Sequence, residues 1–238
     1  MSDGYGHAEG APALHGHADH GHAPAHHPAL QHHFDTMAQQ REAATLGMWV
    51  FLVTEVLFFG GMFLTYAIYR AWYPEAFAVA SHELDVTLGT INTVVLITSS
   101  LTMALAVHAA QLGQRKLVLW FLVATMVLGA AFLGIKSVEY YHKFEEHHVP
   151  GPGFQFEREY LRHAQLFFSL YFIMTGLHAL HMIIGIGIML VMFWWTWRGT
   201  ITEDYYSPIE ISGLYWHFVD IVWIFLFPLL YLIGRHGP

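Results

Sequence analysis

The sequence predicts an all-α integral membrane protein, a bundle of five transmembrane helices preceded by a disordered, His-rich N-terminal tail. Of its 238 residues, 55% are hydrophobic and only 12% are charged, about half the charge of an average globular chain. Five long apolar runs follow residue 43, where the composition changes abruptly. The chain has no cysteine, which excludes disulfides and thiolate sites. A net charge of -8 gives no basic surface for nucleic acid.

Residues 1–43 form the predicted tail, and residues 44–236 form the predicted membrane domain. Nine of the nineteen histidines lie in the tail among Gly, Ala and Pro, with no apolar periodicity. The segment lacks the charged start and apolar centre of a secretory signal. A solvated tail is the preferred interpretation. The alternative is loose binding of Zn²⁺ or Cu²⁺ by a cluster of histidines, namely His15, His17, His20 and His22.

The predicted spans are residues 45–69, 86–111, 117–140, 164–197 and 211–234. At a rise of 1.5 Å per residue, each can cross a hydrocarbon layer of about 30 Å. The runs lack the polar face that a helix of a soluble protein needs. Pro228 predicts a kink in the fifth span. Ala130 and Gly134, four residues apart, predict a close helix approach in the third.

The basic residues are divided almost equally between the two sides of the predicted membrane. The short connection with Arg115 and Lys116 carries the most weight and favours a cytoplasmic N-terminus. An odd number of spans then places the C-terminus outside.

Glu55 lies about ten residues, or about 15 Å, into the first run. A carboxyl at that depth is costly, so we expect it to face other helices and to be largely protonated. One interpretation is a proton-handling or lipid-contact site. The other is a protonated carboxyl that bonds a neighbouring helix.

The other polar side chains in the runs are expected to serve helix packing or subunit contact, and no catalytic residue is expected. Two tryptophans that share a helix face with these polar residues belong to the same group. The full set is Asn92, Lys136, Glu139, His178, His181, Trp216, His217, Asp220 and Trp223. Lys136 and Glu139 share a helix face as an i,i+3 ion pair. Haem ligation by His178 and His181 is the weaker alternative, because a bis-His pocket needs opposed helices.

Five strings occur in order and resemble subunit III of the haem–copper oxidases: VTEVLFFGGMF, INTVVLITSS, SVEYY, TGLHALHMIIG and YWHFVDIVWIFLF. The resemblance extends over residues 40–235. It implies a non-catalytic subunit of a proton-pumping terminal respiratory oxidase that reduces O₂ to water. Such a subunit holds no haem or copper, binds phospholipid and supports proton uptake. Its expected partners are catalytic subunit I as the main contact, subunit II and further respiratory subunits.

The resemblance also implies a place in the bacterial cytoplasmic membrane, with the QLGQRK connection on the cytoplasmic side. Glu55 matches the family's buried, carbodiimide-reactive carboxyl. Long members of the family have seven spans, and this chain lacks the first two. In the long members these two spans form one wall of the lipid cleft, so a partner would have to supply that wall here. The equivalent subunit of a nitric oxide reductase stays as an alternative, as does a haem-binding membrane cytochrome that uses His178, His181 and His217. The electron donor, cytochrome c or quinol, is left open.

Overall fold

The computed structural model describes residues 30–203 and 205–232. All the regular secondary structure in those residues is helical. The four histidines of the tail alternative lie outside them. Five helices are long and apolar enough to cross a membrane, which confirms the predicted fold class. Their bounds are α1 Met37–Trp72, α3 Val86–Gln111, α4 Arg115–Glu145, α5 Leu161–Arg198 and α6 Ser207–Phe227.

The helix ends follow local chemistry. Thr36 caps α1, because its hydroxyl accepts a hydrogen bond from the backbone N–H of Gln39 at 3.2 Å. This cap starts α1 eight residues before the predicted start of the first span. Asp85 caps α3 in the same way, and that helix has the predicted bounds. Gly199, at φ +84°, ends α5.

Two features that follow the C-terminal ends of α1 and α6 differ from simple spans. A short helix, α2 (Pro74–His82), follows α1 and was not predicted. It begins with a proline, which suits the first turn of a helix. At Pro228, where a kink was predicted, α6 ends and the chain continues as a π-helix over Pro228–Leu232.

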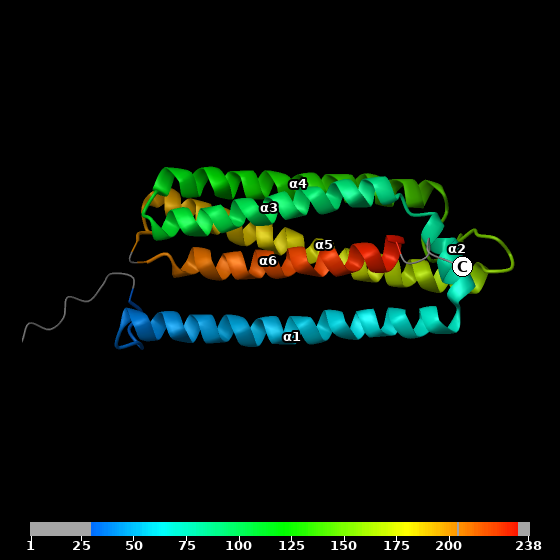
Figure 1. The fold of residues 1–238 in the computed structure, drawn as a ribbon, viewed down its shortest axis with the longest axis horizontal. Coiled ribbons are helices and arrows are strands. Elements are labelled where there is room, and N and C mark those ends of the chain that lie inside the picture. Colours follow the sequence, from blue (N-terminus) through cyan, green and yellow to red (C-terminus); the bar gives the residue numbers. More distant parts are fainter. Residues whose placement is uncertain (1–29, 204, 233–238) are drawn as a thin grey trace, which may run out of the picture.

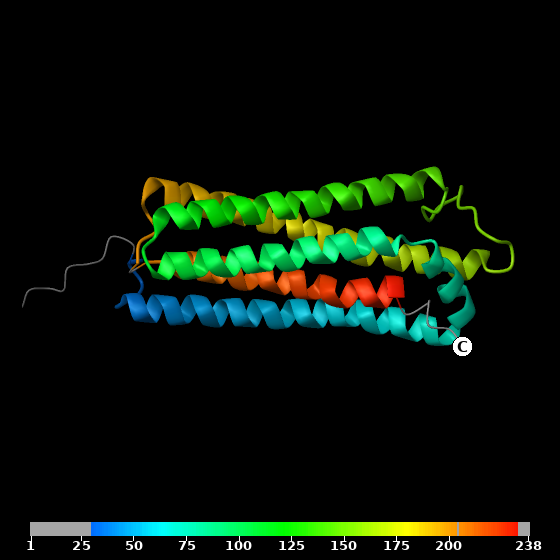
Figure 2. The same ribbon diagram turned by 45° about the horizontal axis from the view of Figure 1, so that its top comes forward.

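The spans form one bundle in which α6 lies between α1 and α3 (Figures 1 and 2). In the most apolar window of each helix, 56% of α6 is buried but only 17% of α1. The start of α1 and the end of the π-helix lie at opposite ends of the bundle (Figure 1). The edge helix α1 therefore presents most of its apolar surface to lipid or to another protein.

A close approach of three helices is built around Trp216, which is fully buried. A Cβ atom at Gly129 would lie 2.7 Å from the Trp216 ring, and one at Gly185 would lie 2.9 Å from it. Both glycines are thus needed to admit the indole. The prediction for Gly134 was wrong, because no atom lies within 4 Å of a Cβ built there. The tight contact is made five residues before Gly134, at Gly129, on the face of α4 that the Trp216 ring reaches.

Candidate functional site

Glu55 is on the side of α1 that faces α5. Its Oε2 atom lies 3.2 Å from Nε2 of His181, and the two side chains are 18% and 14% exposed. The pair lines a groove of about 450 Å³ between α1, α5 and α6, together with apolar side chains such as Phe51 and Ile184. The Phe59 ring packs edge-on against His181 at 5.2 Å. An ionisable pair therefore sits in an apolar groove at membrane depth.

The other nitrogen of His181 fixes where the protons of this pair lie. Its Nδ1 atom is 2.8 Å from the backbone oxygen of Leu177. A carbonyl oxygen only accepts, so Nδ1 carries a hydrogen. Either Glu55 then donates to Nε2 as a carboxylic acid, or an imidazolium donates to the carboxylate. In both forms one proton lies between Glu55 Oε2 and His181 Nε2.

Lys136 and Glu139 form a buried ion pair with a nitrogen–oxygen distance of 2.9 Å. The Lys136 ammonium also donates to the hydroxyls of Tyr171 and Tyr231, at 3.1 and 2.9 Å. Both hydroxyls donate to Glu139 Oε1, at 2.8 and 2.5 Å. We call these four residues the ionic network. It joins α4, α5 and the π-helix, and each charged atom in it has a partner.

His178 and His181 are three residues apart but point to different neighbours. The His178 ring packs against Phe132 of α4 at 5.4 Å and against Trp223 of α6 at 5.3 Å. Its nitrogens are buried and have no hydrogen-bond partner among the described residues. His217 instead bonds α3. The three histidines of the cytochrome alternative thus do not converge on one ligand position.

The two buried tryptophans of α6 attach this helix to α3. Trp216 Nε1 donates to the Ser99 hydroxyl at 2.9 Å, and Trp223 Nε1 donates to the Thr93 hydroxyl at 3.1 Å.

Between these two contacts, His217 Nδ1 lies 2.7 Å from the Ser100 hydroxyl. Asp220 is on the same side of α6 and is 3% exposed, yet neither of its carboxyl oxygens has a partner in the described chain. Buried Asn92 likewise has no partner there.

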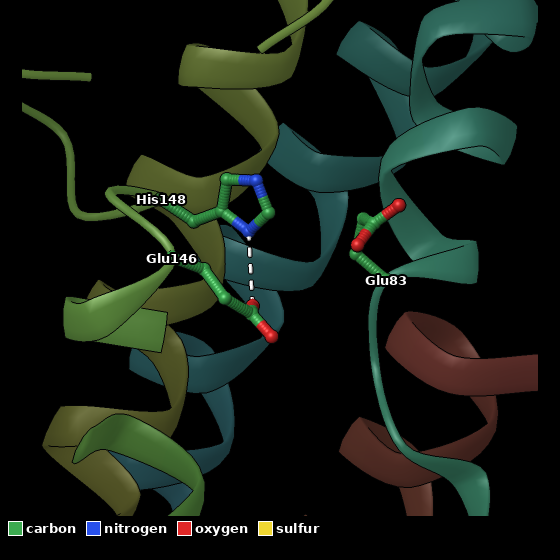
Figure 3. Close-up of side chains that lie close together, drawn as sticks. All are labelled: Glu83, Glu146 and His148. Carbon is green, nitrogen blue, oxygen red and sulfur yellow. Dashed lines mark hydrogen bonds and ion pairs between the residues drawn. The ribbon is translucent and has the colours of Figure 1, made fainter. Parts of the chain in front are cut away.

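A polar cluster lies where the α4–α5 connection meets the turn after α2 (Figure 3). Ligand atoms of Glu83, Glu146 and His148 lie within 4.8 Å of one another, a donor set that suits a cation. However, the ammonium of Lys143 already bonds Glu146 Oε2 at 2.5 Å and the backbone oxygen of Glu83 at 2.7 Å. The cluster therefore contains its own cation. We call these four residues the loop clamp.

The electrostatics of the loop clamp favour a charged Glu146 and a neutral His148. Burial raises the pKa of Glu146, but the hydrogen bond and charge of Lys143, helped by His148, outweigh it and lower that pKa below its ordinary value. Burial first, and then the charge of Lys143, lower the pKa of His148, although Glu146 and Glu83 oppose this shift. Near neutral pH, the imidazole is neutral while Glu146 is ionised.

Comparison with known proteins identifies the fold's family. Residues 28–235 match the family described as cytochrome c oxidase subunit III. The chain belongs to this family. It is 34% identical to cytochrome c oxidase subunit 3 of Thermostichus vulcanus over 199 residues, which cover 80% of this chain and 87% of the relative. It is also 34% identical to quinol oxidase subunit 3 of Bacillus subtilis over 232 residues, covering 93% and 98%.

A third relative is the cytochrome bo(3) ubiquinol oxidase subunit 3 of Pseudomonas aeruginosa, which is 33% identical over 191 residues, covering 79% of this chain and 84% of the relative. Subunit III relatives of both cytochrome c and quinol oxidases thus match this chain to a similar degree. As a subunit III protein with five apolar helices, it is an integral membrane component of an oxidase complex.

Within this subunit III fold, sequence reasoning missed the tyrosines of the ionic network, the serines opposite α6 and the loop clamp. Tyr171 and Tyr231 lie far from Glu139 in sequence and meet it only through the bundle. The i,i+3 spacing of Lys143 and Glu146 was a usable signal for the loop clamp. Its second carboxyl, Glu83, depends on the turn after α2, which the sequence did not predict.

Proposed function

We propose that this chain is the non-catalytic subunit III of a proton-pumping terminal oxidase that reduces O₂ to water. The observation that carries the proposal is the family match, which extends over all five spans. The haem and copper of the reaction would then reside in partner subunits. The polar groups of this chain are bonded or packed within a helical bundle, which supports a scaffold role rather than redox chemistry.

The proposed role is to stabilise catalytic subunit I during turnover, within a complex that also holds subunit II. Large apolar side chains are exposed along α1, among them Trp49, Val53 and Leu57. In a bilayer such faces are covered by lipid or by neighbouring helices. Because α1 is so little buried within this chain, we expect it to pack extensively against helices of a larger membrane subunit.

Lipid binding and support of proton uptake are assigned to the groove at Glu55 and His181. Its apolar walls suit an acyl chain, and its size of about 450 Å³ admits part of one. The proton held between Oε2 and Nε2 makes the pair a candidate for proton storage or transfer. Protonation of the carboxyl also suits the carbodiimide reactivity expected from the family resemblance.

The expected location is the bacterial cytoplasmic membrane, with the N-terminus inside. The connection between α3 and α4, with Arg115 and Lys116, would face the cytoplasm. The loop clamp, at the opposite end of the bundle, would face outward.

Mild-detergent purification through a tag on this chain tests the proposal. We expect co-purification with subunits that carry haem and copper, identified by mass spectrometry, and faster inactivation during turnover when this chain is removed. Mass spectrometry would also show whether the catalytic partner is an oxygen or a nitric oxide reductase. A stable isolated chain whose own absorption spectrum shows a haem Soret band would overturn the proposal.

A further inference from the structure

Asp220 has a combination of properties that packing within this chain does not explain. It lies 13 residues into α6, so it is about 20 Å along the helix from Ser207. That position is near the middle of the bilayer. The side chain is 3% exposed, and neither carboxyl oxygen has a partner with hydrogen-bond distance and angle among the described residues. The nearby Ser100 hydroxyl is paired with Nδ1 of His217, at 2.7 Å. Buried carboxyls normally have partners, because an unbonded one is unfavourable in a medium without water.

Asp220 differs from the other buried polar groups without partners, Asn92 and His178, because it lines a groove that opens on the surface of the bundle. The groove has a volume of about 400 Å³ and runs between α3 and α6. These two helices lie side by side in both views of the bundle (Figures 1 and 2). Asp220 therefore lines the groove, but both of its carboxyl oxygens are buried and lie just beneath the groove surface.

The floor of the groove is polar and its rim is apolar. Ser100 and His217, which bond one another, join Asp220 at the floor. Leu101 and Ile224, which are 60% and 46% exposed, stand at the rim. A short polar strip within an exposed apolar face is the pattern of a helix–helix contact in membranes, where hydrogen bonds between polar side chains join apolar surfaces.

The depth of Asp220 decides between the candidate occupants of the groove. A lipid headgroup lies at the membrane surface and does not reach the bilayer centre. An acyl chain reaches it but has no hydrogen-bond donor for a carboxyl. A transmembrane helix can bring a hydroxyl, amide or basic side chain to that depth and bury apolar surface against the rim.

We propose that the α3–α6 groove is the docking site for a transmembrane helix of the catalytic partner, which places a hydrogen-bond-donating side chain on Asp220. The inference rests on the proposed function, since it presumes a membrane-embedded partner. It adds to that function the surface, the residue and the chemistry of recognition. The Glu55 groove lies on another side of α6 and is left to lipid.

The first test compares variants of this chain within the whole complex. Asp220→Leu removes the acceptor, and Asp220→Asn keeps one amide oxygen that can accept. Thr98→Val is the matched control, because Thr98 is exposed on α3 and its hydroxyl bonds the Val94 carbonyl of its own helix. The measured quantity is the ratio of this chain to the catalytic subunit after washing with increasing detergent.

We expect at least a tenfold loss of this chain with Asp220→Leu, a smaller loss with Asp220→Asn, and retention of Thr98→Val at the wild-type level. Retention of Asp220→Leu at the wild-type level would overturn the inference while leaving the proposed function intact. Failure of the wild-type chain to retain any catalytic subunit would instead overturn the proposed function.

The second test does not depend on the folding of an Asp220 variant. A photoreactive amino acid replaces Ile224 at the groove rim, and irradiated membranes are analysed by mass spectrometry. We expect a cross-link to a transmembrane segment of the catalytic subunit that contains a hydrogen-bond-donating side chain. Cross-links only to lipid, or only to a second copy of this chain, would overturn the inference.

Discussion

Removal of the Lys136 ammonium should weaken the bundle more than removal of the whole ion pair. In Lys136→Met, the apolar stem is kept and three hydrogen bonds are lost, to Glu139 and to two tyrosines. Glu139 Oε2 is left without its donor, although Oε1 keeps two tyrosine donors. Breaking a buried ion pair on one side costs about 3–5 kcal/mol. The remaining donors place the expected cost near the lower bound, at about 3 kcal/mol.

The double variant Lys136→Met, Glu139→Leu provides the internal control. It removes both charges and leaves the two tyrosine hydroxyls, whose rings are 6.4 Å apart, without their charged partners. A lost neutral hydrogen bond costs about 1 kcal/mol, whereas a charge left alone costs more. The double variant should therefore be more stable than Lys136→Met, despite carrying one more substitution.

The lack of cysteine in this chain supplies an assay specific to it within the complex. Ala106→Cys places one thiol at a fully buried site on α3. Labelling of that thiol during a temperature ramp, read on the separated band, reports unfolding of this chain alone. A loss of about 3 kcal/mol should lower the midpoint by about 6–12 °C for a chain of this size. An unchanged midpoint for Lys136→Met, or a double variant that is less stable than Lys136→Met, would refute the reasoning.

Three further predictions concern other parts of the bundle. Gly185→Ala should lower the same labelling midpoint, because its Cβ would lie 2.9 Å from the buried Trp216 ring and overpacking costs about 1–3 kcal/mol; a midpoint at the wild-type level would mean that the indole can move. Glu55→Gln should still assemble with the complex but lose carbodiimide labelling of this chain, and labelling at the wild-type level would show that another acid reacts. In the loop clamp, the pKa values of Glu146 and His148 are lower in the folded state than their ordinary values of 4.5 and 6.5. Both groups therefore stabilise the fold above those ordinary values, and this stabilisation is lost as the pH falls through the folded-state pKa values. Hydrogen exchange of residues 146–160, corrected for intrinsic rates, should therefore rise as the pH falls from 7 to 4, and exchange that is independent of pH would contradict this sign.

The spans could be predicted from sequence because length and apolar composition decide them. The second predicted span agrees with α3 at both ends, since Asp85 gives a strong cap and Gly113, at φ +65°, follows the helix. The helix α1 begins eight residues before the first predicted span, because residues 37–44, four of them polar, extend the helix beyond the apolar run. Hydropathy marks the part of a helix that suits the membrane, whereas caps mark where the helix begins.

Neighbours in the bundle were much harder to predict. The sequence identified Gly134 as a packing position from its spacing, but spacing does not say which face of a helix is inside. That face is set by Trp216, which lies 87 residues from Gly129 in sequence and fills the space above it. For the same reason, the sequence paired Lys136 with Glu139 on one helix but gave no sign of the tyrosines from α5 and the π-helix.

The polar residues of the spans divide by whether this chain alone provides their partners. Glu139 has a donor for each carboxyl oxygen, from its own helix, α5 and the π-helix, so its interactions are complete before any partner binds. Glu55 has one partner, His181, and an open groove beside it. Asp220 has none with hydrogen-bond geometry among the described residues, although it is as fully buried as Glu139. Because a membrane offers no water to complete such a group, the partner helix proposed above would supply the donor. The same comparison separates structural from interface carboxyls without reference to sequence spacing. Its consequence is an ordering of stability: Glu139→Gln should lower the unfolding midpoint of this chain whether or not the partner is bound, whereas Asp220→Leu should lower it only in the assembled complex.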